Sequence, residues 1–404
     1  MPLKSSTIMT QRRQTNQQPH IGIFNDSFPP IIDGVTLTVE NYVRYLAEMN
    51  LNPCVVTPWN PMKVDCGCDV LRYFSLPIPS RRPYRYGYPK IDPFIWRRLA
   101  ATPFRLAHSH CPFSSGRLAV YVKKRQRIPL IGTFHSKYKS DLQHSFRSTP
   151  WCVPIIMKRI LDFFNACDEV WIPQAAVEET VREYGYQGPL TVVDNGIDFT
   201  GMDSEEVASA KKAARSEMGI ADDEISLLFV GQHIWEKGIR VIADALKLID
   251  GKTPFRMNFV GTGYAQGELA RLIESYGIAD RVKINGVVSD RERIKKFYAA
   301  ADLFLFPSLY DNAPLVVREA AALGTPSVIP SGSTASEVIT DEVNGFLTSR
   351  DAAAYASLIS QLTADRDRIR RVGAGARRTL GRSWSDVVEE VADRYRVILK
   401  NFKP

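Results

Sequence analysis

The amino-acid sequence predicts an α/β protein made of two doubly wound domains, each a parallel sheet with helices on both faces. Its 404 residues exceed what a single hydrophobic core usually holds, so two domains are expected. Short apolar runs alternate with segments of helical spacing, which is the pattern of repeated strand and helix units. A polar stretch over residues 199–224 interrupts this alternation, which begins again at Ile225.

The first domain is expected over residues 20–200, behind a polar and basic tail over residues 1–19 that we expect to be disordered. The tail has no apolar core, so it does not have the pattern of a secretory signal. Residues 59–103 are rich in proline and tyrosine, and their path cannot be read from the sequence. The expected strands are 20–24, 53–57, 106–110, 129–134, 169–172 and 191–193, and the expected helices are 35–49, 114–125, 154–167 and 175–184.

The second domain is expected over residues 201–382, and the polar stretch over 199–224 is interpreted as a helix-prone linker that leads into it. Thr334 and Glu337 have the spacing of a capping box at the start of a short helix. A final segment, residues 383–404, carries a helix whose apolar face can pack on either domain, including by crossing back to the first. The expected strands are 225–230, 257–260, 282–284, 303–306 and 327–329, with helices that begin at 238, 267, 291 and 314.

The composition is that of a soluble globular protein, with 45% hydrophobic and 24% charged residues. No uncharged apolar run approaches the roughly 18 to 20 residues that a membrane-spanning helix needs. Six cysteines include one close pair, Cys66 and Cys68, but no second pair at zinc-site spacing. We therefore expect free thiols in a reducing cytosol.

The net charge of +8 is unevenly distributed along the chain. Residues 81–127 contain many lysines and arginines but one acid, Asp92. Such a field attracts phosphates, anionic lipid or nucleic acid. A basic nucleic-acid-binding protein is therefore one alternative for this chain, although no nucleic-acid-binding module is recognisable in it.

The most informative stretch is a short apolar strand over 303–306 followed by a helix whose first position suits Pro314. In that register Ala313 is the N-cap, and alanine has no side-chain acceptor for the free amides of the first turn. The amides of Leu315 and Val316 then need a partner from elsewhere. An anion would serve, because the helix dipole favours negative charge there by about 0.3 to 1 kcal/mol.

Two acids flank this anion site, Asp311 before the helix and Glu319 inside it. Both can accept hydrogen bonds from hydroxyl groups, as the hydroxyls of a sugar would donate. A phosphate site beside hydroxyl acceptors suggests a nucleotide sugar as the ligand. The alternative is an ordinary surface helix whose acids are solvated.

The segment 311–319 resembles the signature of the GT-B retaining glycosyltransferases of family 4, in which an acid, seven residues and a glutamate follow a Phe-Pro-Ser strand end. The resemblance implies two doubly wound, Rossmann-like domains that face one another across a cleft, and metal-independent catalysis. It is closest to lipid-directed members such as diacylglycerol glucosyltransferases and phosphatidylinositol mannosyltransferases. The other motifs of the family follow in the expected order at residues 29–35, 133–136, 195–198, 231–238 and 261–263.

This resemblance assigns roles to individual residues of the second domain. It implies that Asp311 contacts the donor sugar, that Glu319 binds the ribose, and that Lys237 neutralises the diphosphate together with the amides of Leu315 and Val316. Asp311 replaces the glutamate usual in the family, and its side chain is one methylene shorter.

Four further positions complete the set of donor-binding residues that the resemblance implies. Gln232 stands where the family usually has an arginine, so the diphosphate clamp lacks one charge unless another cation substitutes. The backbone of Val287 and Val288 lies where the family reads the edge of the base. The turn from Gly261 to Gly263 is expected to shape the cleft rather than to bind the donor. Gly34 closes on the donor from the first domain, where glycine lets the backbone approach.

Histidines mark the carboxyl ends of two strands in the first domain. The resemblance places His135 near the donor sugar and the acceptor, as a catalytic residue with Asp311 and Lys237, while a structural hydrogen-bonding role is its alternative. His108 and His110 share one side of a strand, which is also compatible with a metal site. We do not expect that site to be used, and we expect no metal and no cofactor.

The sequence therefore predicts a retaining hexosyltransferase that uses a UDP- or GDP-sugar, with a membrane glycerolipid as the expected acceptor. A saccharide or lipopolysaccharide acceptor is the alternative. Cations and aromatic rings over residues 81–98 suit a lipid headgroup layer. We expect a cytoplasmic protein that docks on the anionic inner face of the cell membrane and binds no nucleic acid.

Overall fold

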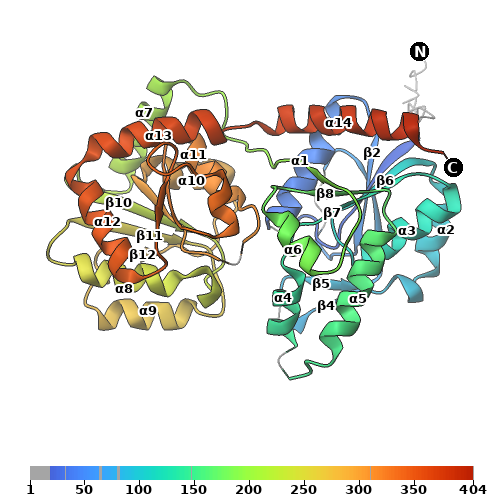
Figure 1. The fold of residues 1–404 in the computed structure, drawn as a ribbon, viewed down its shortest axis with the longest axis horizontal. Coiled ribbons are helices and arrows are strands. Elements are labelled where there is room, and N and C mark those ends of the chain that lie inside the picture. The colour runs from blue at the N-terminus through green and yellow to red at the C-terminus, as the bar shows by residue number, and fades with distance from the viewer. Residues whose placement is uncertain are drawn as a thin grey trace, which may run out of the picture.

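The computed structural model describes residues 19–31, 33–62, 66–79, 82–146, 148–309 and 311–403, without the side chain of His144. Most of the tail expected over 1–19, and Arg81 of the expected membrane-docking segment, lie outside these residues. The chain folds into two parallel sheets, each with helices on both sides (Figure 1). The predicted α/β, doubly wound fold class is confirmed.

The first sheet has seven strands in the order β3-β2-β1-β6-β7-β8-β9, all parallel. Its strands are β1 (His20–Phe24), β2 (Pro53–Pro58), β3 (Asp69–Tyr73), β6 (Phe104–Ser109), β7 (Leu130–Thr133), β8 (Glu169–Ile172) and β9 (Leu190–Val192). Its helices are α1 (Gly34–Glu48), α2 (Pro93–Ala101), α3 (Ser114–Gln126), α4 (Tyr138–Ser145), α5 (Cys152–Asn165) and α6 (Val177–Glu183). The proline-rich region before α2 forms a hairpin, β4 (Ser75–Pro77) with β5 (Arg85–Gly87), and a turn of 3-10 helix, η2 (Pro89–Ile91).

The second sheet has six parallel strands in the order β12-β11-β10-β13-β14-β15. They are β10 (Ile225–Val230), β11 (Phe255–Val260), β12 (Val282–Ile284), β13 (Leu303–Leu305), β14 (Ser327–Pro330) and β15 (Phe346–Thr348). The α-helices are α7 (Ser204–Glu217), α8 (Ile239–Ile249), α9 (Gln266–Ser275), α10 (Arg291–Ala300), α11 (Leu315–Ala322), α12 (Ala352–Ala364), α13 (Arg366–Leu380) and α14 (Trp384–Asn401). Two 3-10 helices, η3 (Trp235–Lys237) and η4 (Thr334–Val338), complete this half of the chain.

The last helix, α14, lies against the first sheet rather than the second, and Figure 1 shows it beside α1. Trp384, Val388 and Tyr395 of α14 share one buried apolar cluster with Ile21 and Trp171 of the first domain. None of the described helices, α14 included, is both long and apolar enough to span a membrane.

Two stretches of chain that connect the domains run side by side. The amide of Ile197 donates to the carbonyl of Arg382 at 3.0 Å, and the amide of Trp384 donates to the carbonyl of Ile197 at 3.3 Å. A Cβ atom on Gly196 would lie 2.6 Å from Cα of Trp384, so this close passage requires glycine there. The outgoing and returning connections therefore form one paired junction.

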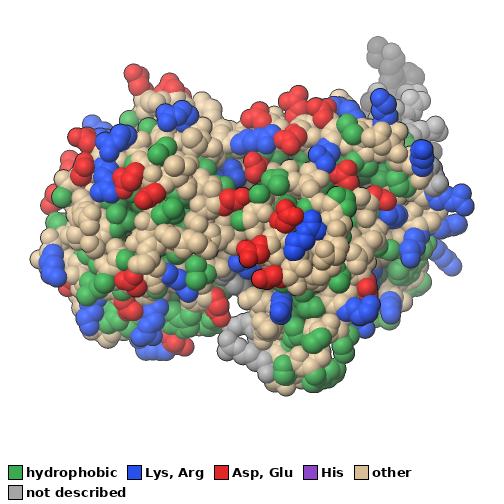
Figure 2. Space-filling model, viewed as in Figure 1, with side chains coloured by type: hydrophobic (Ala, Val, Ile, Leu, Met, Phe, Trp, Pro, Cys, Tyr) green, Lys and Arg blue, Asp and Glu red, His purple; other side chains and the backbone are tan. Residues whose placement is uncertain are grey.

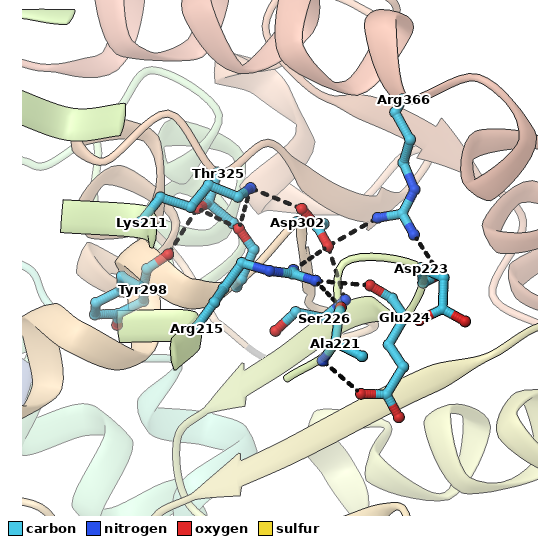
Figure 3. Close-up of polar contacts among 11 residues, drawn as sticks. Lys211, Arg215, Ala221, Asp223, Glu224, Ser226, Tyr298, Asp302, Thr325 and Arg366 are labelled. Carbon is cyan, nitrogen blue, oxygen red and sulfur yellow. Dashed lines mark hydrogen bonds and ion pairs between the residues drawn. The ribbon is translucent and has the colours of Figure 1, made fainter. Parts of the chain in front are cut away.

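Helix α7 corrects the prediction of a linker over 199–224. Buried Asp302, which precedes β13, forms ion pairs with Lys211 and Arg215 of α7 at 2.7 and 2.8 Å and with Arg366 at 3.0 Å (Figure 3). Although burial raises the pKa of Asp302, Lys211, the Ser226 amide and Arg215 hold it below its usual range. Charge pairing thus fixes α7 to the second domain, although its sequence is polar enough to suggest a linker.

Candidate active site

The turns that follow β10 and β13 place two predicted catalytic side chains in contact. The ammonium of Lys237 lies 2.8 Å from Oδ1 of Asp311, and the Ser308 hydroxyl donates to Oδ2 of Asp311 at 2.7 Å. Lys237 also lies over the Phe306 ring, 5.9 Å from its centroid. The lysine and the acid come from segments 74 residues apart, so the fold brings them together at the carboxyl ends of adjacent strands.

Glycines allow these turns to pack backbone against backbone. A Cβ atom on Gly238, whose φ is +74°, would lie 2.5 Å from the carbonyl oxygen of Pro307. A Cβ atom on Gly261 would lie 1.9 Å from the carbonyl oxygen of Gly231, which no side chain can tolerate. Glycine at position 261 therefore lets this turn pack directly against the turn after β10, and its role in shaping the cleft stays a prediction.

Helix α11 begins one residue later than predicted, with Pro314 rather than Ala313 as its N-cap. Pro314 makes no side-chain cap, and its carbonyl accepts only from the amide of Val317, at 3.2 Å. The amides of Leu315 and Val316 have no hydrogen-bond partner among the described residues. The free donors predicted from the sequence are thus present at this helix end.

Gly34 of the first domain lies opposite this helix end. A Cβ atom on Gly34 would lie 3.8 Å from Cδ1 of Leu315, and Leu315 packs on the apolar cluster of the first domain. Gly34 begins α1, where the Asp33 carboxylate caps the helix by accepting from the amide of Thr36 at 2.7 Å. Two helix N-termini, one from each domain, therefore approach the same region.

Glu319 is far more enclosed than a free hydroxyl acceptor would be. It is 5% exposed, it lies 2.7 Å from Nη2 of Arg291, and it accepts from the Tyr298 hydroxyl at 2.8 Å. Arg291 also lies 3.0 Å from Asp198, at the junction of the domains. Ribose binding by Glu319 stays a prediction, and it requires that a ribose hydroxyl share a carboxylate that already accepts from two donors.

The remaining predicted donor contacts lie on the surface of the second domain. Gln232 is exposed, and its side chain forms no hydrogen bond with another described residue. Val287 is 62% exposed, whereas Val288 packs partly against the core of the second domain. The backbone groups of both valines lack hydrogen-bond partners in the described part of the chain, which leaves them available to a base edge.

His135, which follows β7, is linked to a second histidine. Its Nε2 lies 3.0 Å from Nδ1 of His110, and burial lowers the pKa of His135 to about 4. Its backbone carbonyl accepts from Nδ2 of Asn312 at 3.3 Å, so it lies where the two domains meet. Both ring nitrogens of His108 are hydrogen-bonded, Nε2 to the hydroxyl of Thr133 and Nδ1 to the hydroxyl of Tyr395 in α14, each at 2.6 Å.

Among the described residues, no group of three or more His, Cys, Asp or Glu side chains lies close enough to hold a metal ion. The Cys66 and Cys68 sulfurs lie 3.1 Å apart and form no disulfide.

Lys137 is a cation at the contact between the two domains, and sequence analysis gave it no role. Its ammonium donates to the carbonyl of Leu309 and the hydroxyl of Thr334 in the second domain, both at 3.1 Å. Burial lowers the pKa of Lys137, and the carboxylates of Asp311 and Glu183 oppose that shift. Its place two residues after His135, in a motif already singled out, was the signal that could have identified it.

The two domains also touch through η4, and this contact corrects the predicted capping box. Ser333, not Thr334, is the N-cap of η4 and makes no side-chain cap. The Glu337 carboxylate instead accepts from the amide of Ala176 in the first domain at 2.8 Å. Gln174 donates to the carbonyl of Thr334. The residues with capping-box spacing thus join the domains.

Comparison with known proteins agrees with this geometry. The family model described as Glycosyltransferase Family 4 matches residues 32–200, and the one described as Glycosyl transferases group 1 matches residues 210–379. A D-inositol 3-phosphate glycosyltransferase of Xylanimonas cellulosilytica is 30% identical over 308 residues, which cover 72% of each chain. The chain belongs to glycosyltransferase family 4. It is therefore a transferase enzyme with the predicted family membership.

Other relatives of this glycosyltransferase extend the comparison. An alpha-monoglucosyldiacylglycerol synthase of Acholeplasma laidlawii is 23% identical over 347 residues, covering 84% of this chain and 87% of the relative. The structure of Anabaena HepE with UDP and glucose superimposes with a TM-score of 0.74 at 18% identity, covering 94% of this chain and 99% of that one. Sucrose-phosphate synthase of Thermosynechococcus elongatus also gives 0.74, at 20% identity, covering 95% and 100%. These likenesses confirm the predicted GT-B fold.

Proposed function

We propose that this glycosyltransferase moves a hexosyl group from a nucleoside diphosphate sugar to an acceptor hydroxyl, with retention of anomeric configuration. The observation that carries the proposal is the pair of unpartnered amides, Leu315 and Val316, at the N-terminus of α11 beside Lys237 and Asp311. Free amides and a helix dipole bind phosphate, and a nearby carboxylate binds sugar hydroxyls. HepE, whose fold this chain shares, is known with UDP and glucose.

In the proposed complex the diphosphate lies between Lys237 and the start of α11, and the sugar lies against Asp311. The ion pair between Lys237 and Asp311 holds both side chains in place before the donor binds. When the phosphate arrives, Lys237 exchanges a carboxylate oxygen for a phosphate oxygen and Asp311 becomes available to hydroxyls. The backbone of Val287 and Val288 reads the base, and Gly34 allows the first domain to approach the phosphates.

Lys137 supplies a second positive charge to the diphosphate. Gln232 cannot supply it, because it stands where the family usually has an arginine. Its present partners, the Leu309 carbonyl and the Thr334 hydroxyl, are neutral, and it forms no ion pair among the described residues. An ammonium whose partners are neutral can accept an anionic partner at little cost. Because Lys137 belongs to the first domain, its contact with the phosphates would also hold the cleft closed.

The proposed chemistry is front-face substitution, in which the leaving phosphate helps to remove the proton of the acceptor hydroxyl. No enzymic nucleophile takes part. Lys237, Lys137 and the α11 amides stabilise the negative charge that develops on the leaving diphosphate, so we propose that no metal ion is required. His135 lies beside the reacting centre and orients the donor sugar.

For the acceptor we propose a membrane glycerolipid, since one relative is an alpha-monoglucosyldiacylglycerol synthase. A surface suited to an anionic membrane supports this choice. Two apolar side chains, Ile91 at the end of η2 and Phe94 at the start of α2, are 67% and 70% exposed. Lys90, Arg97 and Arg98 are exposed around them. Asp92 caps α2, accepting from the amides of Phe94 and Ile95, so this arrangement is fixed.

A second apolar site lies at the tip of the α4 and α5 hairpin. Trp151 and Ile155 there are 71% and 48% exposed. Figure 2 shows hydrophobic side chains at this tip, and lysine and arginine side chains along the edge of the first domain that is remote from the second. A peripheral enzyme at the inner face of the cell membrane would present these side chains to the headgroups.

A soluble polyol phosphate is the second candidate acceptor. It is favoured by the relative with the higher identity, the 30% identical D-inositol 3-phosphate glycosyltransferase. The two candidates differ in their need for a membrane surface. A lipid acceptor predicts transfer that depends on vesicles, whereas a polyol phosphate predicts transfer in free solution.

Thermal stabilisation by a panel of UDP- and GDP-sugars tests the donor. A ligand at 100 times its dissociation constant adds about 2.7 kcal/mol to stability, which is readily measured. No stabilisation by any member of the panel would contradict the proposal.

Vesicle cosedimentation tests the membrane surface. Binding to anionic vesicles should fall when Arg97 and Arg98 become serine, because each cation near the surface contributes about 1 kcal/mol. The matched control replaces exposed Arg271 and Arg293 of the second domain, which should leave binding unchanged. Equal binding to neutral and anionic vesicles would rule the surface out.

A further inference from the structure

The predicted catalytic histidine, His135, is held by a buried neighbour, His110, that has no role in the proposed chemistry. His110, which follows β6, is 1% exposed, and its ring is stacked on that of His135 with centroids 5.2 Å apart and planes 19° apart. Nδ1 of His110 and Nε2 of His135 are 3.0 Å apart. One of these two nitrogens must donate a proton to the other, and the structure indicates which one.

His110 is itself fixed on both sides. The His108 ring lies 4.2 Å from it, and the Tyr42 ring meets it edge to face at 5.2 Å. His108 is in turn held at both nitrogens, by the Tyr395 hydroxyl and the Thr133 hydroxyl. A ring packed this closely cannot rotate to exchange its two nitrogens, so the bond to His135 always uses Nδ1 of His110.

The second nitrogen of His110 determines the direction of the bond. Its Nε2 is buried and has no hydrogen-bond partner among the described residues. Burial lowers the pKa of both His110 and His135, so each ring carries a single proton. If that proton were on Nε2 of His110, a buried N–H group would be unpaired, which folded proteins rarely tolerate. A bare nitrogen lone pair in the same place needs no acceptor, and the proton is then on Nδ1.

We propose that His110 is a positioning residue that donates its Nδ1 proton to Nε2 of His135 and so keeps the proton of His135 on Nδ1. That nitrogen of His135 is neither hydrogen-bonded nor buried in the described part of the chain. It therefore presents a fixed N–H donor on a residue whose backbone carbonyl accepts from Asn312 of the second domain. Resting on the proposed function, this inference makes His135 a hydrogen-bond donor to an oxygen atom of the bound donor sugar, and not a base.

Nitrogen-15 NMR of the histidine rings tests the tautomer without any substrate. In the free enzyme at pH 7, the His135 ring, identified by its loss in His135→Gln, should be protonated on Nδ1 and bare on Nε2. His110→Asn should preserve this state, because its side-chain amide can donate in place of Nδ1. His110→Ala should remove the preference for the Nδ1 tautomer, so that part of the His135 population carries the proton on Nε2. A wild-type His135 protonated on Nε2 would overturn the proposal.

Tyr395→Phe is the matched control for a purely structural effect. It removes a buried hydrogen bond from the same histidine stack but leaves the bond between His110 and His135 intact. It should lower the melting temperature as a structural defect does, with the His135 tautomer unchanged. A changed tautomer in Tyr395→Phe would mean that any disturbance of the stack suffices, and that His110 has no specific role.

Kinetics then connect the tautomer to transfer. His110→Ala should lower kcat about tenfold with little change in donor dissociation constant, and His110→Asn should recover most of that loss. Equal losses in the two variants would overturn the positioning role. The NMR result stands by itself: if no sugar is transferred at all, the proposed function fails while the tautomer of His135 is still determined.

Discussion

The carboxylate of Glu319, which is buried in the second domain, lies 2.7 Å from the guanidinium of the half-buried Arg291. Tyr298 donates to the other oxygen of the same carboxylate. This acid therefore has a structural partner before any nucleotide binds. A ribose hydroxyl would add to an existing network, so donor binding and domain stability are coupled at this residue.

Replacement of Glu319 by glutamine should accordingly do two things. It should weaken nucleotide-sugar binding, since charge-assisted hydrogen bonds contribute about 1.5 to 3 kcal/mol. It should also destabilise the second domain by about 1.5 to 3 kcal/mol, the contribution of a charge-assisted hydrogen bond, because Arg291 loses its nearest carboxylate but keeps Asp198 as a partner. Calorimetric titration and thermal unfolding measure the two effects separately.

Tyr298→Phe is the control for this pair of effects, because it removes one hydrogen bond to Glu319 but keeps the charge. It should lower stability by about 1 kcal/mol and leave donor affinity nearly unchanged. Unchanged donor affinity in Glu319→Gln would contradict the ribose assignment, whatever its stability.

A second prediction concerns the cation that replaces the missing charge at Gln232. Lys137→Gln should weaken donor binding about tenfold or more, because a charge-assisted contact to the diphosphate is lost. Adding Gln232→Arg to that variant should restore much of the affinity by supplying a cation from the second domain. If Lys137→Gln binds the donor as well as the wild type, Lys137 only joins the domains.

The third prediction concerns His135, on the premise that it lies beside the reacting centre. His135→Ala should lower turnover about tenfold or more and alter donor affinity less, as expected for a contact that matters mainly in the transition state. Single-turnover kinetics at saturating donor give the comparison. A collapse of affinity with normal turnover at saturation would make His135 a binding residue only.

The fourth prediction is a loss of stability in acid. Burial holds the pKa of His108 and His110 well below 6.5, so both are neutral in the folded protein while the unfolded chain takes up protons below about pH 6.5. Stability therefore falls as the pH falls, by about 1.4 kcal/mol per histidine for each pH unit below 6.5.

Comparison with His110→Asn isolates the histidine contribution. Glu40, whose pKa burial raises to about 7, acts in the opposite direction and is common to both proteins. The fall in melting temperature between pH 7 and pH 5.5 should be smaller in the variant than in the wild type. An equal fall in both would show that His110 is not held neutral by the fold.

Local sequence patterns predicted the strand ends and the turns that follow them. The free amides of Leu315 and Val316 could be inferred because they depend only on what lies next to them in the chain. The one-residue error at Pro314 has little effect, since proline lacks an amide wherever the helix begins.

Contacts that depend on how the domains meet could not be predicted. Lys137, Thr334 and Glu337 acquire their partners from the other domain, and no local pattern encodes that placement. The linker prediction failed because ion pairs to Asp302 anchor α7 together with a narrow apolar contact through Ala210, Ala214 and Met218. Polar residues that pair across the fold resemble solvated ones in the sequence. The ion pair between Glu319 and Arg291, which are 28 residues apart, could not be predicted either, because paired side chains resemble solvated ones in the sequence.

Calorimetric titration of nucleoside diphosphate into wild type, Lys237→Gln and Asp311→Asn tests the proposed donor site, using the nucleotide found in the stabilisation screen. Lys237→Gln should bind about 10- to 100-fold more weakly, because the diphosphate loses a charged partner. Asp311→Asn should bind at least as tightly as the wild type, because it frees Lys237 from its ion pair. Equal affinity in wild type and Lys237→Gln would contradict the proposed donor site.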